Sequence, residues 1–278
     1  MPRRISARLG LLIAVLVFAA TLPGSAGATP APPLSAADDA SVAAPDPSWR
    51  EPDLRMASLR DFRISFSSGR KLLRFTAMLI NVGEGHFEVH GWRATRLEST
   101  MRTAQGMYTD RGSRVWLRRP PTAAMRYSGD GHDHWHVTRI ANTEVRPIGA
   151  LDSAPVRSAK TGFCFFDTDP YNLSLPRAPA SPRYSGASCG TRASLKVHMG
   201  LSVGWGDTYS WNLPYQWVDV TGLPDGDYRV CSTADPQGWY VETNDANNRT
   251  FADIRISGSS ATVLGLGWWA CNNPRPGV

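Results

Sequence analysis

Hydrophobic and polar residues alternate along most of the chain from Asp53 onward, in short runs rich in β-branched and aromatic side chains. Successive side chains of a strand point to opposite faces, so this period of two predicts strands with one buried face. The runs are Phe62 to Phe66, Leu72 to Ile80, His86 to His90, Val115 to Leu117, His134 to Ile140, Gln216 to Val220, Asp227 to Ser232 and Thr250 to Ile256. Clusters of Gly, Pro, Asn and Asp separate them, and no long amphipathic helix is predicted.

These strands predict an all-β fold, a single β-sandwich-like domain with long ordered loops that carry the functional site. Two long segments lack strand character, residues 118–131 and residues 167–191. Loops of this length inside a compact domain are usually functional or disordered. We expect the second to be ordered, because Cys164 and Cys189 stand close to its two ends.

The first residues indicate export. Three arginines precede the apolar stretch Leu9 to Ala20, and Ala26-Gly27-Ala28 follows it. A basic start, an apolar stretch and an Ala-x-Ala site are typical of a secretory signal peptide, here residues 1–28 with cleavage near Ala28. The apolar stretch is shorter than the roughly 20 residues of a spanning helix. The paired Arg3-Arg4 leaves both the general and the twin-arginine export routes open, and we expect a secreted, extracellular protein.

Composition then divides the rest of the chain. Residues 29–48 are rich in Ala, Pro, Ser and Asp and show neither the hydrophobic period of a strand nor that of a helix, which predicts a disordered spacer. Residues 49–273 are expected to form the folded domain. The formal charge of +6, less the three arginines of the signal, gives +3 for the mature chain. This modest excess of scattered basic residues does not indicate a nucleic-acid partner, and no integral membrane segment is expected in the mature chain.

The chain has four cysteines, Cys164, Cys189, Cys231 and Cys271. In an exported protein an even count predicts disulfides, and four cysteines allow three pairings. We favour Cys164 with Cys189 and Cys231 with Cys271, since each pair closes a loop of moderate length. No Cys-x-x-Cys occurs, so the sequence indicates structural cysteines.

Three of the six histidines stand at alternate positions, His132, His134 and His136. On a strand they would leave one face about 6.8 Å apart, whereas a bound metal needs each nitrogen at roughly 2.0–2.1 Å, so we expect inward-leaning rings on a curved strand. Trp135 should pack beneath the site on the other face. Imidazole suits copper, zinc, iron and nickel, so the histidines predict a metal site without choosing the ion.

Four more motifs follow the histidines. They are residues 160–168 (KTGFCFFDT), 204–209 (GWGDTY), 215–221 (YQWVDVT) and 242–248 (ETNDANN). In this order, from about Pro52 to Cys271, the chain resembles the catalytic domain of the lysyl oxidase family, the copper amine oxidases that act on protein lysines. The chain departs from animal members at Gly131, where they have a cysteine, and in a longer interval from Lys160 to Tyr209, which bears on the substrate entrance.

The resemblance implies that His132, His134 and His136 bind Cu²⁺, and that Lys160 and Tyr209 become the cross-linked cofactor lysine tyrosylquinone. The residue types fit, because only a phenol can be oxidised to such a quinone and only a free amine can add to it. We expect a pocket that desolvates the lysine. The implied reaction oxidises lysine ε-amines of peptides or proteins, and more widely small primary amines, with dioxygen to aldehydes, hydrogen peroxide and ammonia.

Asp207 is a candidate base for removing the substrate's α proton, because it stands two residues from Tyr209. A structural carboxylate that caps a turn is an equally good interpretation. Two other functions stay open: a non-catalytic secreted β-sandwich that binds metal or mediates adhesion, and a zinc hydrolase. The zinc hydrolase leaves Lys160 and Tyr209 without a role.

Carboxylate and amide oxygens crowd residues 242–248, as a hard cation such as Ca²⁺ requires. The family resemblance adds Asp53 by its side chain and Leu54 by its carbonyl. The predicted calcium site therefore joins the start of the domain to a late hairpin, and its residues are Asp53, Leu54, Glu242, Asn244, Asn247 and Asn248.

Overall fold

The computed structural model describes residues 46–128, 133–160, 162–268 and 271–272, all within the unit Asp39–Val278. Strands dominate these residues, with only short 3-10 helices beside them, so the predicted all-β fold is confirmed. The predicted signal peptide, and the predicted spacer as far as residue 45, lie outside the described residues. No helix in the described ranges is long and apolar enough to cross a membrane.

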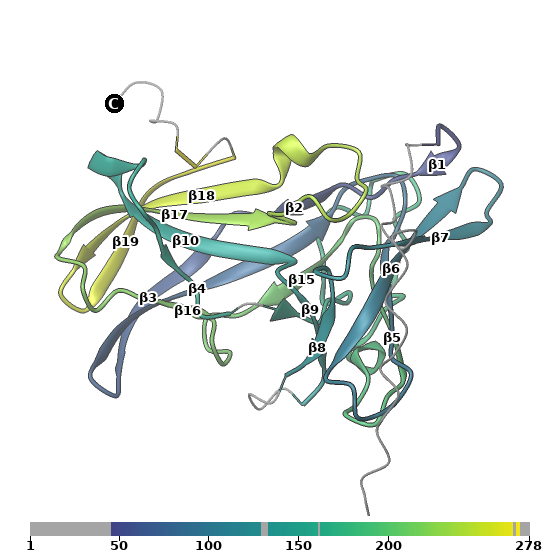
Figure 1. Ribbon diagram of the computed structural model, residues 1–278. Coiled ribbons are helices and arrows are strands. Elements are labelled where there is room, and N and C mark those ends of the chain that lie inside the picture. The colour runs from purple at the N-terminus through teal and green to yellow at the C-terminus, as the bar shows by residue number, and fades with distance from the viewer. Residues whose placement is uncertain (1–45, 129–132, 161, 269–270, 273–278) are drawn as a thin grey trace, which may run out of the picture. The chain divides into compact units, whose positions relative to one another are not determined.

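The strands form three antiparallel sheets (Figure 1). The first contains β1 (Trp49–Arg50), β5 (Phe87–Trp92), β6 (Thr100–Thr109), β7 (Arg114–Arg118), β8 (Met125–Tyr127), β9 (Trp135–Thr138), β12 (Gly162–Phe163) and β14 (Lys196–Leu201). The second contains β10 (Ala141–Pro147), β11 (Val156–Arg157), β17 (Gly226–Ala234), β18 (Arg249–Ser257) and β19 (Ser260–Gly267). The third contains β2 (Leu54–Met56), β3 (Arg60–Ser67), β4 (Arg70–Asn81), β13 (Asp169–Pro170), β15 (Trp205–Tyr209) and β16 (Trp217–Asp219). The short helices are η2 (Ile148–Ala150), η3 (Gly186–Cys189) and η4 (Asp245–Asn247).

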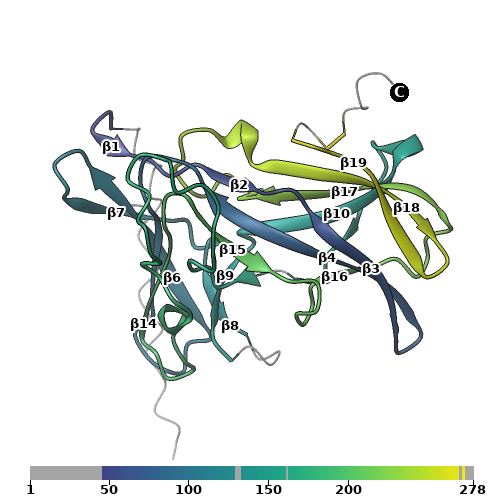
Figure 2. The same ribbon diagram turned by 180° about the vertical axis from the view of Figure 1, so that it is seen from behind.

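Strand β4 organises the third sheet, as Figure 2 shows from behind. Its first half pairs with β3 and β16, and its second half pairs with β2 and β15. Nearly every residue of β4 from Leu72 on is buried, which matches its continuous apolar sequence. This strand therefore fixes β15 and β16, which lie on either side of the candidate site.

One continuous apolar cluster is shared by all three sheets. Phe87 is fully buried, with its ring centroid 4.9 Å from that of Phe165 and 5.1 Å from that of Tyr240. An aromatic side chain buries 150–250 Å², worth about 4–6 kcal/mol at roughly 25 cal/mol per Å². The loop that carries Phe165 is therefore held by the core.

Each of the eight predicted runs corresponds to an observed strand, with small shifts of the ends. The longest strand that the sequence pattern missed is β6, in which Gln105 is fully buried. The Gln105 amide donates to the Val241 carbonyl over 2.7 Å and accepts from the Val241 N–H over 2.8 Å. A polar side chain satisfied in this way interrupts the hydrophobic pattern while the strand stays buried.

Both favoured disulfides are present, Cys164–Cys189 and Cys231–Cys271, with Cα atoms 5.7 Å and 5.8 Å apart. The first closes the long segment 167–191, which contains only the short elements β13 and η3. Within it, the Asp167 carboxylate accepts the backbone N–H groups of Arg183 and Tyr184. The expectation of an ordered loop is confirmed. The segment 118–131 contains the short strand β8 and is described only as far as residue 128.

Candidate functional site

The described part of the histidine motif brings two imidazoles together. The rings of His134 and His136 have centroids 4.8 Å apart and are tilted by 60°. Two imidazoles that share one ion hold their centroids about 5 Å apart, because each nitrogen lies roughly 2.0–2.1 Å from the metal. The pair therefore fits a shared metal ion, and His132 lies outside the described residues.

The strand that carries this motif is shorter than the sequence predicts. Strand β9 begins at Trp135, and Asp133 has a left-handed backbone with φ +47°, so extended alternation does not reach back through residue 133. The two rings are nevertheless closer than the spacing of about 6.8 Å along a strand, as expected of rings that lean inward. The turn at Asp133 supplies curvature that alternation alone does not predict.

Trp135 and His136 are successive residues of β9, so the Trp135 side chain lies on the opposite face of the strand from the His136 ring. It is fully buried, and its indole N–H donates to the Thr191 carbonyl over 2.8 Å. The guanidinium of Arg93 lies 4.6 Å from the centre of the Trp135 ring. This packing shields the back of β9 from water.

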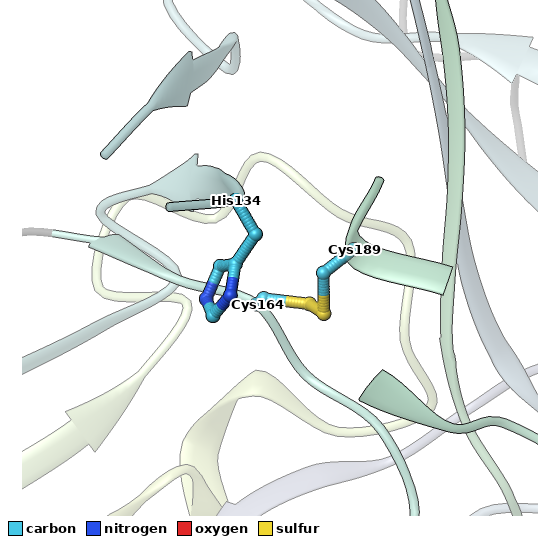
Figure 3. A group of neighbouring side chains, drawn as sticks. All are labelled: His134, Cys164 and Cys189. Carbon is cyan, nitrogen blue, oxygen red and sulfur yellow. A yellow bond between two sulfur atoms is a disulfide. The ribbon is translucent and has the colours of Figure 1, made fainter. Parts of the chain in front are cut away.

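The Cys164–Cys189 disulfide lies against His134 (Figure 3). One ligand atom from each of these three side chains falls within 4.8 Å of the others, a spacing at which a metal could be held. Because the two sulfurs are bonded to each other, neither is a thiolate, and His134 alone retains metal-binding capacity in this group. The disulfide instead fixes the chain beside the histidine.

Lys160 lies where the three sheets meet, between β11 of the second sheet and β12 of the first. Its backbone N–H donates to the Ser158 hydroxyl, and Ser158 forms an isolated bridge with Val218 of β16 in the third sheet. The Lys160 side chain is only 5% exposed. The expectation that its pocket removes it from water is confirmed.

Tyr209 faces Lys160 from the end of β15. The Lys160 Nζ lies 5.2 Å from the centre of the Tyr209 ring and 4.9 Å from that of Phe163. The Tyr209 hydroxyl donates to the Cys164 carbonyl over 2.5 Å, and the rings of Phe163 and Tyr209 meet edge to face. The buried lysine and phenol, 49 positions apart in the chain, are therefore neighbours.

Asp207 is on the same strand as Tyr209 and, two residues away, on the same face. It is 2% exposed, and burial raises the pKa of its carboxyl well above its usual range, although hydrogen bonding with Tyr209 and the charge of Lys160 act to lower it. Burial also raises the pKa of Tyr209, so the phenol stays protonated at neutral pH. A protonated Asp207 can donate to the Tyr209 oxygen while Tyr209 donates to Cys164.

Lys160 borders three hollows. A cavity of about 10 Å³, about the least that holds one water, is lined by Lys160 and Tyr209 and also by Phe163, Gln216 and Ser232. A pocket of about 330 Å³ opens from Lys160 past His136 and Tyr215. A third, of about 420 Å³, opens past Arg139 and Arg157 and is called here the arginine pocket. The Lys160 member of the buried pair can therefore be reached by a side chain of substrate size, whereas Tyr209 lines only the small cavity.

Two residues beside Lys160 were not predicted. Ser158 orients the lysine's backbone, and Gln216, 4% exposed, lines the small cavity and donates to the Phe75 carbonyl. Gln216 lies in the motif 215–221, which the sequence singles out, but no role was predicted for Gln216 itself. Ser158 has no comparable sequence signal.

The predicted calcium ligands cluster between β2 and η4. The Glu242 carboxylate accepts the Leu54 N–H over 2.8 Å and the Asn248 amide over 2.7 Å, and the Asn247 amide donates to Asp53 over 3.1 Å. Asn244 is exposed, and its side chain caps η4 by accepting the Ala246 N–H. The structure thus brings together four of the side chains and the Leu54 backbone.

Three oxygens in this cluster are suited to bind a cation. The Oδ1 atoms of Asp53, Asn247 and Asn248 are buried without a hydrogen-bond partner among the described residues. Burial raises the pKa of Glu242 to about 9, which indicates a carboxyl that lacks a compensating positive charge. Buried carboxylate and amide oxygens are the donors that Ca²⁺ prefers, so the residues fit this ion.

Fold and site together define a disulfide-linked all-β protein with paired imidazoles beside a buried lysine and tyrosine. The lysyl oxidase family model matches residues 130–265. The chain is 24% identical over 189 residues to lysyl oxidase homolog 2 of Gallus gallus, covering 66% of this chain and 18% of that protein. It is 35% identical over 66 residues to protein-lysine 6-oxidase of Homo sapiens, covering 24% of this chain and 16% of that protein.

The family match and these relatives support a place for this chain in the lysyl oxidase family. The matched segments span less than a fifth of the length of these two relatives. The family match covers the histidine motif, Lys160, Tyr209 and Glu242, whereas Asp53 and Leu54 precede it.

Proposed function

We propose that this protein is a copper-dependent amine oxidase that oxidatively deaminates lysine ε-amines of peptides or proteins, and more widely small primary amines. The observation that carries the proposal is the Lys160 amine, buried 5.2 Å from the centre of the Tyr209 ring. Burying a lysine costs free energy, because desolvation penalises its charge, so its position beside a phenol points to a chemical role. The relatives named protein-lysine 6-oxidase support the same class of activity.

In this proposal His132, His134 and His136 hold Cu²⁺, and Lys160 and Tyr209 are the precursors of lysine tyrosylquinone. The metal and the quinone, once present, supply the redox chemistry that the twenty ordinary side chains lack. The overall reaction converts R–CH2–NH2, dioxygen and water to R–CHO, ammonia and hydrogen peroxide.

The chain's own residues position the reacting groups. Cys164 holds the Tyr209 hydroxyl through its carbonyl, and Phe163 packs against the Tyr209 ring and excludes water. Asp207 holds a proton beside Tyr209 and, after losing it, would serve as the base for the substrate's α proton. The wider pockets would admit the amine and dioxygen.

The proposed setting is extracellular, with residues 1–28 removed during export by either route. The two disulfides agree with an oxidising compartment. Lysine-containing peptides or proteins and dioxygen are the proposed partners, and residues 49–273 the proposed catalytic domain.

Peptide mapping by mass spectrometry of the copper-loaded mature protein tests the proposal. We expect one cross-linked species that joins the Lys160 and Tyr209 peptides, lost in Lys160→Ala and Tyr209→Phe. The matched control is Lys196→Ala, which removes an exposed lysine and should keep the cross-link.

Activity gives a second measurement. Hydrogen peroxide release from a lysine peptide should vanish in His134→Ala and Lys160→Ala. If copper-loaded protein yields only separate peptides and releases no peroxide, the amine oxidase proposal is wrong and a non-catalytic metal-binding protein remains.

A further inference from the structure

The arginine pocket is positively charged at its mouth. Arg139 and Arg157 flank the opening, Lys160 lies at its inner end, and Asn142 and Gln237 add amide groups to its walls. No carboxylate lines it among the described residues. Its volume of about 420 Å³ is within the usual range for small-ligand sites.

Arg139 is held in an unfavourable backbone conformation. Its φ of +57° is left-handed, at the corner where the chain leaves β9 for β10. This conformation costs a non-glycine residue about 1–2 kcal/mol, whereas glycine adopts it freely. Strain of this kind recurs at functional sites, although Asp61 and Ser68 in this chain share it.

Arg157 is only weakly neutralised by its neighbours. Its Nε lies 3.9 Å from the Glu144 carboxylate, and its side chain is 65% exposed. Glu144 also pairs with Arg146 through its other oxygen, so one carboxylate serves two arginines. Together, Glu144 and its two arginines therefore leave a net positive charge beside the pocket.

We propose that the arginine pocket selects amines with a carboxylate close by, that is, a lysine flanked by Asp or Glu or a lysine with a free α-carboxylate. The inference rests on the proposed function, because it assumes that the substrate amine is delivered to Lys160 and Tyr209. An amine approaches as an ammonium ion and is repelled by both arginines. A neighbouring carboxylate converts this repulsion into attraction, and guanidinium groups match carboxylates in shape and charge.

Three amidated, acetylated peptides of equal length test the inference: lysine flanked by glutamate, by alanine, or by arginine. We expect kcat/KM by peroxide release to fall in that order, with roughly a tenfold advantage of glutamate over alanine that shrinks at high salt. A fourth peptide, with alanine neighbours and a C-terminal lysine carboxylate, separates the two carboxylate sources.

Arg139→Gly and Arg157→Ala should each bring the glutamate-to-alanine ratio of kcat/KM towards 1. The matched control is Arg126→Ala, which removes the same charge from the pocket on the His136 side and should keep the ratio. A wild-type ratio of 1 or below, a ratio retained in both arginine-pocket variants, or a ratio lost only in Arg126→Ala would each overturn the inference.

Equilibrium binding of the same peptides to metal-free protein, where no oxidation takes place, gives a readout independent of turnover. Tighter binding of the glutamate peptide, lost in Arg139→Gly, supports the inference. If no peptide is oxidised but this preference remains, the proposed function fails while the pocket's selectivity stands. Equal binding of the glutamate and alanine peptides overturns the inference even in an active enzyme.

Discussion

Gly162 determines how closely the lysine segment approaches the histidine strand. It pairs with Thr138 in the ladder between β12 and β9. A Cβ atom built on Gly162 would lie 3.1 Å from the Cβ of His136 and 3.3 Å from the Val137 carbonyl oxygen. The absence of a side chain at this position therefore helps to place the His136 ring.

Gly162→Ala should displace His136 by a few tenths of an ångström and weaken copper binding, because metal affinity is sensitive to ligand orientation. Changes beside a ligand typically cost about 10–100-fold in affinity, and we expect the lower end. A competition titration with a chelator of known affinity measures it. Gly149→Ala, which meets no atom within 4 Å, is the control. Unchanged affinity in Gly162→Ala would show that His136 is not positioned by this contact.

The residues of the candidate site could be identified from the sequence, but the distances between their side chains could not. The alternation of His134 and His136 predicted a shared face, while the left-handed turn at Asp133 carries no sequence signal. Lys160 and Tyr209 were paired through the family resemblance. Their contact depends on Ser158 joining β16, which no local period encodes.

At the scale of elements, the first sheet is tied together by one buried carboxylate. Glu88 on β5 is 2% exposed and accepts the hydroxyls of Tyr108 and Tyr184, the former over 2.7 Å. It also pairs with Arg114 of β7 over 2.8 Å and with His198 of β14 over 3.4 Å. Burial alone would raise the pKa of Glu88, but the contact with His198 and the hydrogen bonds from Tyr184 and Tyr108 outweigh it and lower the pKa to about 2.

This network predicts how stability depends on pH. Because the folded pKa of Glu88 is below the unfolded value of 4.5, its contribution is complete above about pH 4.5 and is lost as the pH falls towards 2. The full contribution is about 3 kcal/mol. Urea unfolding between pH 2.5 and 7 should show Glu88→Gln less stable at pH 7 and less pH-dependent below 4.5. Glu84→Gln, an exposed control, should follow the wild type. Parallel wild-type and Glu88→Gln profiles would contradict the prediction.

Strands with one apolar face were predictable, and strands with polar or glycine residues in the core were not. Strand β15 has the sequence WGDTY, in which Gly206 and buried Asp207 hide its strand character. Strand β5 was predicted, but the partners of Glu88 come from β6, β7, β14 and the long segment 167–191. The meeting of these groups at Glu88 depends on the order of the strands in the sheet, which local alternation does not specify.

At the scale of the whole described domain, the proposed calcium site joins β2 near its start to η4 and β18 near its end. The connection already includes the Leu54 N–H to Glu242 hydrogen bond and a backbone bond from Thr243 to Pro52 over 2.9 Å. A cation bound by the Asp53, Asn247 and Asn248 oxygens would satisfy atoms that otherwise lack partners in the described structure. Closing a long stretch of chain in this way stabilises the folded state against its unfolded ensemble.

Calcium should therefore raise the melting temperature of the wild type. An ion present at 100 times its Kd adds about 2.7 kcal/mol, which corresponds to a rise of roughly 5–10 °C for a domain of this size. Glu242→Ala removes two hydrogen bonds and should be less stable in any buffer, but its melting temperature should no longer respond to calcium. Asp245→Asn, an exposed change in the same loop, should retain most of the response. Differential scanning calorimetry of protein freed of calcium by dialysis, in buffers with and without added calcium, measures both effects. Equal melting temperatures of the wild type in the two buffers would reject the site, and an equal calcium response in Glu242→Ala would place the ion elsewhere.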